Sequence, residues 1–354
     1  MLALVAAVEV VIGGLRHDLA SPLAEDWRIT AMAASEKAPG CDVLCFGDSL
    51  VKYGVLPRVI RAKSGLKSYN LATSGGTMPS AFFLLRQALD AGARPRAVVA
   101  DFAALMLDDP DPPAMQDYAE LATYRDCLDL AWASKSGGFL AGATLSKLLP
   151  SYQWRFEVRN SIRAAFEGRS LSNRAALATY RARWARESGA HPMPPGRVRY
   201  PTEATLIDGV SPETWTCEPR NRRYLERFLE LAASHQITVY WLIPPLCPEA
   251  HARREARGSD RLYGEFVRGI VAKHPNVVVC DARPSGYDNS VHTDHLHLDR
   301  RGAAVLSADL ASVLADRRGG AEPGPAWVEM PDFAGRTIEN PPSSVAQSRA
   351  SRSH

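Results

Sequence analysis

The sequence lacks a strong charge imbalance and any cysteine pattern, and each absence narrows the class of protein. Its 42 Lys and Arg nearly balance 39 Asp and Glu, which gives a net charge of +3 over 354 residues. This balance does not indicate a nucleic-acid partner, and we expect none. Six cysteines show neither metal-ligand spacing nor a dense disulfide framework, so we expect no metal site. They lie at positions 41, 45, 127, 217, 247 and 280.

A long uninterrupted apolar run is also missing. Residues 1–20 are apolar only as far as Leu15 and include Glu9, whereas a membrane-spanning helix needs about 20 apolar residues. No Lys or Arg precedes the run, as a signal peptide would require. Two interpretations of residues 1–20 fit this pattern. One is a buried helix, and the other is a membrane anchor that was truncated by a misplaced initiator Met. We favour the anchor. Residues 21–40 are polar and are interpreted as a tether.

Alternating strand and helix patterns predict an α/β domain over residues 41–104 and 221–318. Continuous apolar runs without alternation are typical of parallel strands that are covered on both faces. Five such strands are expected, at residues 43–47, 68–72, 96–102, 237–245 and 276–282. Amphipathic helices are expected at residues 78–92, 221–235, 260–275 and 300–318. This order predicts a doubly wound parallel sheet, which binds ligands beyond the carboxyl ends of its strands.

Residues 105–220 show no clear strand and are interpreted as a mostly helical insertion. Residues 108–129 hold seven acids and one Arg, and residues 155–199 hold ten Arg and three Glu. Two solvated faces that neutralise each other are the favoured interpretation. The alternative is a basic cap that attracts an anionic glycan or lipid surface. Residues 319–354 are rich in Pro, Ser, Gly and Arg and are predicted to be disordered.

Ser49 follows the first strand in the segment CDVLCFGDSLVKYGVLP, residues 41–57. Gly, Asp and Ser form ordinary turns, but a serine here would also stand at the carboxyl edge of the sheet. A serine nucleophile needs a base. His297 lies in the loop after the last strand, at the same edge, and Asp294 precedes it by three residues. Although His297 alone could be a surface residue, an Asp three residues before it and a serine expected at the same sheet edge together favour a Ser-His-Asp triad.

A Gly-Gly pair follows the second strand in NLATSGGTMPS, residues 70–80. Glycines at a strand-to-helix junction allow close backbone approach and leave N–H groups exposed. The N–H of Gly75 is therefore a candidate oxyanion donor together with the N–H of Ser49.

These segments together resemble the SGNH (GDSL-type) hydrolases. FGDSLV is similar to the first family block, NLATSGGT to the second and DHLHLDRRG to the last, over roughly residues 41–102 and 238–315. The resemblance implies Ser49 as nucleophile, His297 as base, Asp294 as orienting acid and Gly75 as oxyanion glycine. It also implies a flavodoxin-like three-layer α/β/α fold, and acyl ester hydrolysis or transfer with no metal and no cofactor.

One block departs from the family pattern. The family has Gly-x-Asn-Asp after the third strand, whose Asn donates to the oxyanion, and this sequence has VVADFAALMLDD there. Leu105 falls near the Asn position, and Asp101 and Asp108 would repel an oxyanion. A similar departure occurs in membrane-anchored members of the family that act in polysaccharide O-acetylation. The N-terminus, the basic insertion and the WLIPP strand resemble that branch.

The sequence therefore predicts a serine esterase or acyltransferase that acts on a small-molecule or glycan O-acyl ester. The alternative is a non-catalytic glycan-binding protein on the same fold. We expect an extracytoplasmic protein attached to a membrane through its N-terminus, with a cytoplasmic protein as the alternative. The sequence does not indicate the acyl chain, a protein partner or the oligomeric state.

Overall fold

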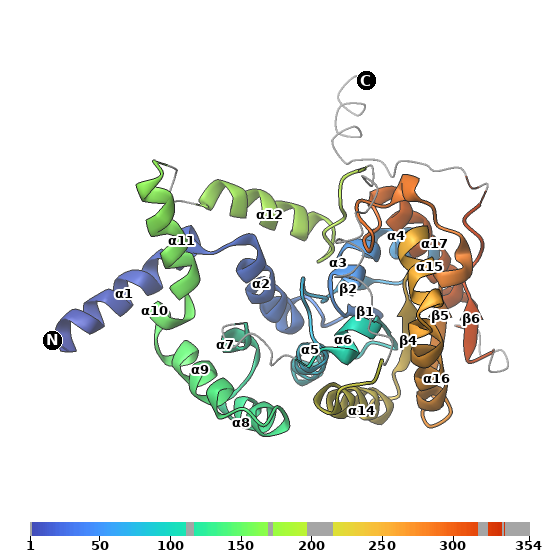
Figure 1. Cartoon of the computed structure of the whole chain (residues 1–354), viewed down its shortest axis with the longest axis horizontal. Helices are drawn as coiled ribbons and strands as arrows, with labels where there is room; N and C mark the ends of the chain where they lie inside the picture. Colours follow the sequence, from blue (N-terminus) through green and yellow to red (C-terminus); the bar gives the residue numbers. More distant parts are fainter. Residues whose placement is uncertain are drawn as a thin grey trace, which may run out of the picture.

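The computed structural model describes residues 2–110, 117–168, 173–196, 215–317, 325–334 and 336. A single sheet of six parallel strands lies at its centre, in the order β2-β1-β3-β4-β5-β6 (Figure 1). The strands are β1 (Val43–Phe46), β2 (Ser68–Asn70), β3 (Ala97–Ala100), β4 (Thr238–Ile243), β5 (Val277–Asp281) and β6 (Trp327–Glu329). This confirms the predicted α/β class, and the strand order of the first five is that of flavodoxin. The order reverses between β1 and β3, so a switch point lies there.

The sixth strand corrects the prediction of a five-stranded sheet and, for residues 325–334 only, the prediction of a disordered tail over residues 319–354. β6 pairs in parallel with β5, and Phe333 beyond it is 4% exposed and stacks on Tyr287 at 4.4 Å between ring centroids. The Ser285 hydroxyl also donates to the Met330 carbonyl. Burial of these rings holds the segment on the domain. Residues 318–324, 335 and 337–354 lie outside the described residues.

Helices cover both faces of the sheet. Alternate side chains of β1 point to opposite faces, with Leu44 and Phe46 in one apolar core and Val43 and Cys45 in the other. The first core is closed by α2 (Pro22–Glu36), α5 (Met78–Asp90), α14 (Pro219–Ser234) and α16 (Ser259–Val271). The second is closed by α3 (Ser49–Gly54), α4 (Pro57–Ser64) and α17 (Arg300–Asp316). The result is a three-layer α/β/α arrangement.

The N-terminal segment forms two helices, α1 (Leu2–Leu19) and α2. The interpretation of residues 21–40 as a tether is wrong, because α2 packs into the core with Trp27 6% exposed. Ser21 caps α2 by accepting the Ala24 N–H. In α1, the Glu9 carboxylate accepts hydrogen bonds from the backbone N–H and hydroxyl of Ser151. None of the helices in the described part of the chain has the length and apolar content that a membrane span requires.

The described residues between β3 and α14 form helices. They are α6 (Ala104–Asp108), α7 (Tyr118–Leu121), α8 (Tyr124–Ala133), α9 (Gly137–Leu148), α10 (Pro150–Gln153), α11 (Arg155–Phe166) and α12 (Arg174–Arg186). In Figure 1, α8 to α11 lie with α1 on the side away from β4 and β5, and α12 runs back toward the sheet. The remaining elements are α15 (Pro248–Ala256) and two 3₁₀ turns, η1 (Arg283–Ser285) and η2 (Asn289–Val291).

Candidate functional site

The turn after β1 has a geometry that requires glycine. Gly47 has φ of +135°, and a Cβ atom there would lie 1.5 Å from Asp101 Oδ1. The Asp48 carboxylate then accepts the Leu50 N–H at 2.7 Å and caps α3. Ser49 is therefore the first residue of α3, at the carboxyl end of β1 and beside the switch point of the sheet.

The three residues of the predicted triad form one chain of hydrogen bonds. Ser49 Oγ lies 2.7 Å from His297 Nε2, and His297 Nδ1 lies 2.8 and 3.0 Å from the two carboxylate oxygens of Asp294. Because Nδ1 faces a carboxylate, it carries the ring proton, and Nε2 is left to accept the proton of the Ser49 hydroxyl. Residues 248 positions apart in the chain thus meet at one sheet edge.

The loop that carries His297 is held by its own backbone. Asp294 Oδ1 accepts the N–H groups of Leu296 and His297, each at 2.8 Å, and the Thr293 N–H donates to the His297 carbonyl. Burial raises the pKa of Asp294, but the hydrogen bond and charge of His297 and the two N–H groups outweigh burial and lower it to about 2. Asp294 is therefore ionised at neutral pH and fixes both the position and the tautomer of the imidazole.

Gly302 allows the loop to join α17 at close range. A Cβ atom at Gly302 would lie 2.9 Å from Leu298 Cδ2 and 3.0 Å from the Val291 carbonyl oxygen. Asp299 caps α17 by accepting the N–H groups of Arg301 and Gly302. The glycine and the cap set the direction of α17 directly after the loop that carries His297.

The loop that contains Gly75 lies next to the turn at residues 47–49. The Thr73 N–H donates to the Gly47 carbonyl at 3.2 Å, and a Cβ atom at Gly76 would lie 2.4 Å from that same carbonyl oxygen. Gly75 is exposed with φ of +67°. Among the described residues, its N–H has no hydrogen-bond partner, and its role as an oxyanion donor stays a prediction.

Asp26 of α2 supports this loop, which sequence reasoning did not anticipate. Its carboxylate accepts the Ser74 N–H at 2.8 Å, and Trp27 Nε1 donates to the Ser74 carbonyl. Asp26 also pairs at 2.6 Å with Lys52 Nζ of α3, and both side chains are at most 1% exposed. The buried ion pair of Asp26 and Lys52 therefore links α2, the loop that contains Gly75 and α3, the helix that begins at Ser49.

Two acids, Asp48 and Asp101, lie close together at the turn that precedes Ser49. Asp101 is fully buried, and its Oδ1 accepts the Asp48 N–H at 3.1 Å. Burial and the neighbouring charge of Asp48 raise the pKa of Asp101 well above its ordinary value, which favours the neutral acid. A neutral Asp101 would carry no charge to repel an oxyanion, so the repulsion expected from the sequence depends on the protonation of this buried acid.

The other two residues of the departing block lie in α6 and at its end. Leu105 is half-buried in this helix, and Asp108 ends it and accepts the Thr216 N–H at 3.5 Å. Residues 97–108 contain no Asn, so a family-type amide donor is missing from this segment.

The segment after α12 forms part of the surroundings of the triad. The His191 N–H donates to the Lys52 carbonyl at 2.9 Å, and its ring stacks on Tyr180 at 4.6 Å between centroids. Tyr53 lies between the two histidines, with its ring centroid 6.2 Å from His191 and 5.2 Å from His297. The region predicted as an insertion thus reaches the site, although no motif in the sequence indicates this.

In residues with a described position, no group of three or more His, Cys, Asp or Glu side chains could hold a metal ion. The six cysteines are free thiols.

Comparison with known protein families and with curated proteins found no match to this chain. The site is therefore interpreted from its own geometry. The site lies at the switch point of a parallel sheet of flavodoxin order. It consists of a hydrogen-bonded chain of Ser49, His297 and Asp294, and the loop of Gly75 packs against the turn before Ser49.

Proposed function

We propose that the protein is a serine-dependent acyl ester hydrolase or acyltransferase of the SGNH type. The observation that carries the proposal is the chain from Ser49 Oγ through His297 to Asp294, with contacts of 2.7 and 2.8 Å. A serine bound to an imidazole that a carboxylate orients is the arrangement that activates a hydroxyl as a nucleophile.

The reaction proceeds in two steps, acylation of Ser49 and deacylation. Ser49 Oγ attacks the ester carbonyl while its proton passes to His297 Nε2, and the resulting oxyanion accepts hydrogen bonds from the N–H groups of Ser49 and Gly75. His297 then returns the proton to the leaving alkoxide, which leaves an acyl group on Ser49. Water or a sugar hydroxyl attacks this acyl-enzyme as His297 Nε2 takes its proton. The bond between the acyl carbon and Ser49 Oγ then breaks, His297 returns the proton to Oγ, and the carboxylic acid or the acylated sugar leaves.

The choice between water and a sugar hydroxyl depends on how the tetrahedral intermediate is stabilised. One oxyanion donor contributes a factor of about 10²–10³ to kcat, and the block that carries the family Asn has none. With two backbone donors, hydrolysis by unpositioned water is slow, and an acceptor held by the protein gains from orientation. We therefore favour transfer of the acyl group to a glycan over hydrolysis.

Labelling with a fluorophosphonate tests the proposal, because this probe reacts with activated serines. The parent protein should be labelled at Ser49, and Ser49→Ala should lose both the label and p-nitrophenyl acetate turnover while it keeps its melting temperature. Ser312→Ala is the matched control, since Ser312 is exposed on α17 and bonds only within its helix. Equal labelling of the parent and Ser49→Ala would end the proposal and favour the glycan-binding alternative.

A further inference from the structure

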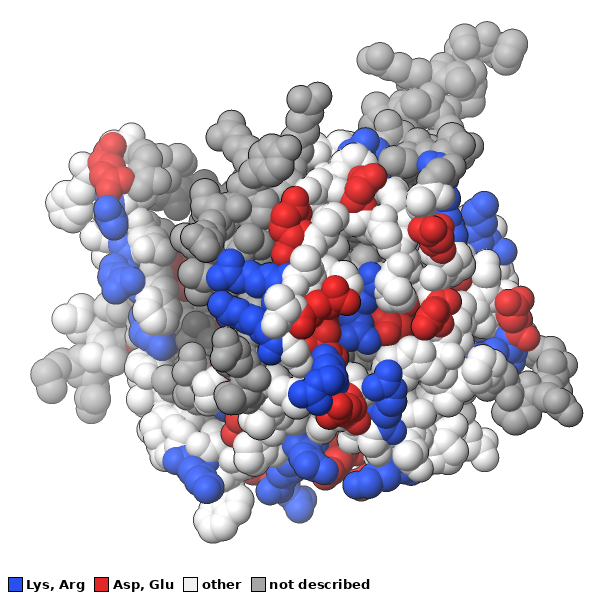
Figure 2. Space-filling model, turned by 45° about the vertical axis from the view of Figure 1, so that its right-hand side comes forward, with Lys and Arg blue, Asp and Glu red and all other residues white. Residues whose placement is uncertain are grey.

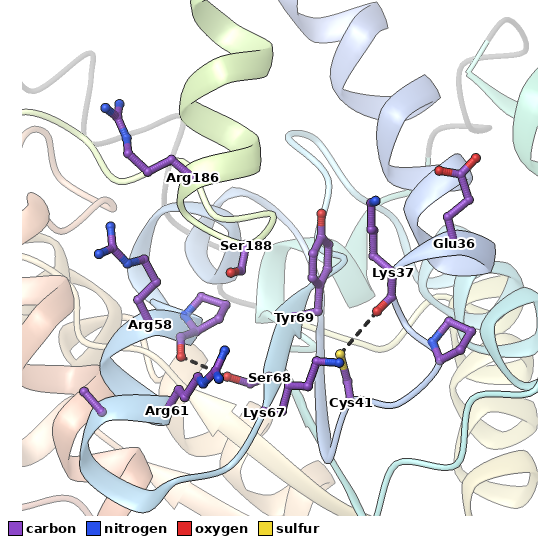
Figure 3. Close-up of a pocket in the computed structure, with 13 residues that line it drawn as sticks. Glu36, Lys37, Cys41, Arg58, Arg61, Lys67, Ser68, Tyr69, Arg186 and Ser188 are labelled. Atoms are coloured by element: carbon purple, nitrogen blue, oxygen red, sulfur yellow. Dashed lines mark hydrogen bonds between the residues drawn. The ribbon is translucent and has the colours of Figure 1, made fainter. Parts of the chain in front are cut away.

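A cavity whose lining includes none of the triad residues lies along the free side of β2. It has a volume of about 720 Å³ and is walled by the ends of α2 and α12, by α4 and by the start of β2. This volume lies in the range of pockets that hold small molecules. The α12 wall is fixed in place, because the Asn70 N–H of β2 donates to the Ser188 carbonyl at 2.9 Å. Figure 3 shows the side chains that line it.

Positive side chains dominate this cavity. Five cations line it, and Glu36 is the one acid among the lining residues. The cations are Lys37, Arg58, Arg61, Lys67 and Arg186. Within the described part of the chain, the exposed residues Arg58, Arg61 and Lys67 form no ion pair. The two buried arginines, Arg220 and Arg254, each form one. Unpaired cations that converge on one cavity favour binding of an anion.

Two nearby acids, Asp42 and Glu187, are each paired with an arginine that does not line the cavity. Glu187, next to Arg186, is engaged at 2.6 Å by Arg300 from the other side, and its contact with Arg186 is 3.8 Å. Figure 2 shows a face of the molecule on which Lys and Arg lie beside Asp and Glu. With a net charge of only +3, the concentration of cations in this cavity is a local feature and not an effect of overall basicity.

The cavity also offers a flat apolar surface. Tyr69 of β2 is half-buried, and Figure 3 shows its ring between Arg58 and Arg61 on one side and Lys37 on the other. Its ring edge contacts Trp184 of α12 at 5.8 Å between centroids, which fixes the orientation of the ring. Ser68 and Ser188 add polar groups to the lining. An aromatic ring beside hydroxyls and cations suits a sugar ring that carries a negative charge.

We propose that this cavity binds an anionic, sugar-sized ligand whose phosphate or carboxylate lies among Arg58, Arg61 and Lys67. Guanidinium groups bind both anions through paired N–H donors, and the cavity is larger than a single inorganic ion requires. The site does not depend on the chemistry of Ser49, since none of its lining residues belongs to the triad.

Isothermal titration of the full chain with four probes tests the proposal. Glucose 1-phosphate and glucuronate carry both parts of the ligand, inorganic phosphate carries only the charge, and glucose carries only the ring. We expect one of the two charged sugars to bind more tightly than phosphate, and glucose to give no signal. Binding should weaken as sodium chloride rises from about 50 to about 300 mM, because salt screens exposed cations.

Two variants on one helix localise the binding. Arg61→Gln should weaken the charged sugar about tenfold, which is the effect of one charge-assisted contact. Lys63→Gln is the matched control, because Lys63 is also exposed in the last turn of α4 but does not line the cavity. Helix-dipole effects are then equal in the two variants.

Several outcomes would overturn the proposal. Equal affinity for phosphate and both charged sugars would reduce the site to one for an inorganic ion. Equal weakening by Arg61→Gln and Lys63→Gln, or no binding by any charged probe, would exclude the cavity as the site. Tighter binding of a single-stranded oligonucleotide, lost in Arg61→Gln, would replace the sugar with nucleic acid.

Discussion

At the scale of single residues, the three histidines of the loop after β5 differ in what they contact. His297 reaches Ser49 and Asp294. His292 is fully buried, and its Nδ1 lies 2.8 Å from the Asp288 carbonyl oxygen. His295 is half-buried and contributes its backbone carbonyl to the Cys247 N–H. Of the three rings, only that of His297 contacts Ser49 and Asp294, so it is the one that fits the proposed role of base.

Replacement of single histidines tests that assignment. His297→Ala should lower kcat for an activated ester by several orders of magnitude, since it removes a triad member. His295→Ala should change kcat by less than about tenfold, because no contact of its ring with the triad is present. Steady-state kinetics on the two purified variants gives the comparison, and circular dichroism checks that both are folded. A larger loss in His295→Ala would refute the assignment.

At the scale of elements, α2 is part of the site through the buried pair of Asp26 and Lys52. Breaking a buried ion pair leaves one charge uncompensated and costs about 3–5 kcal/mol. Asp26→Asn should therefore lower the free energy of unfolding by this amount. It should also lower kcat more than it changes KM, because Ser74 and Gly75 lose their fixed position. Urea unfolding and ester kinetics measure both effects.

The chain supplies a matched control for this change. Asp42→Asn also removes an aspartate from an ion pair, but the pair of Asp42 with Arg96 is exposed, with 59% of the Arg96 side chain accessible. Its loss should cost less than about 1 kcal/mol. A second variant, Asp26→Asn with Lys52→Met, should regain part of the stability, since no buried charge is then unpaired. Equal effects of Asp26→Asn and Asp42→Asn would contradict the role given to α2.

The segment after β6 provides another test at this scale. Phe333 is 4% exposed against Tyr287, so Phe333→Ala should lower the free energy of unfolding by about 3–5 kcal/mol. Phe166→Ala is the control, because Phe166 is 89% exposed and should change stability by less than about 0.5 kcal/mol. Denaturant titrations of both variants decide the matter. If Phe333→Ala were as mild as the control, this segment would not be docked in solution.

At the scale of the whole molecule, the sequence predicted the sheet and the triad because their signals are local or topological. Asp294 and His297 lie three residues apart, and the parallel topology brings their loop to Ser49. The tether was a wrong interpretation because α2 buries Glu25 and Asp26, which look solvent-exposed in a sequence. β6 has only three residues, too few for a period to appear. His191 and Lys52 meet through tertiary packing, which no spacing encodes.

Two groups with lowered pKa values, His191 and Asp294, should each make the free energy of unfolding fall on acidification, in separate pH ranges. Burial and the charges of Arg183 and Lys52 lower the pKa of His191 to about 4, whereas in an unfolded chain it is about 6.5. Between these values the unfolded chain binds a proton that the folded protein does not, so the free energy of unfolding decreases as pH falls. Asp294, with a folded pKa of about 2, stabilises the fold above about pH 4 and loses that contribution as pH falls toward 2.

Urea titrations across this range separate the two groups. His191→Gln should flatten the dependence between about pH 6.5 and 4, by on the order of 1 kcal/mol because water partly screens the ring. The decline between about pH 4 and 2 should stay, since Asp294 is unchanged in this variant, and it serves as the internal control. His191 packs on Tyr180 and Tyr53 beside the triad. Its Nε2 lies 3.4 Å from Arg183 Nη1, so protonation of the ring would place two positive charges next to each other. Identical curves for the parent and His191→Gln between pH 6.5 and 4 would show that the ring titrates as it does in an unfolded chain.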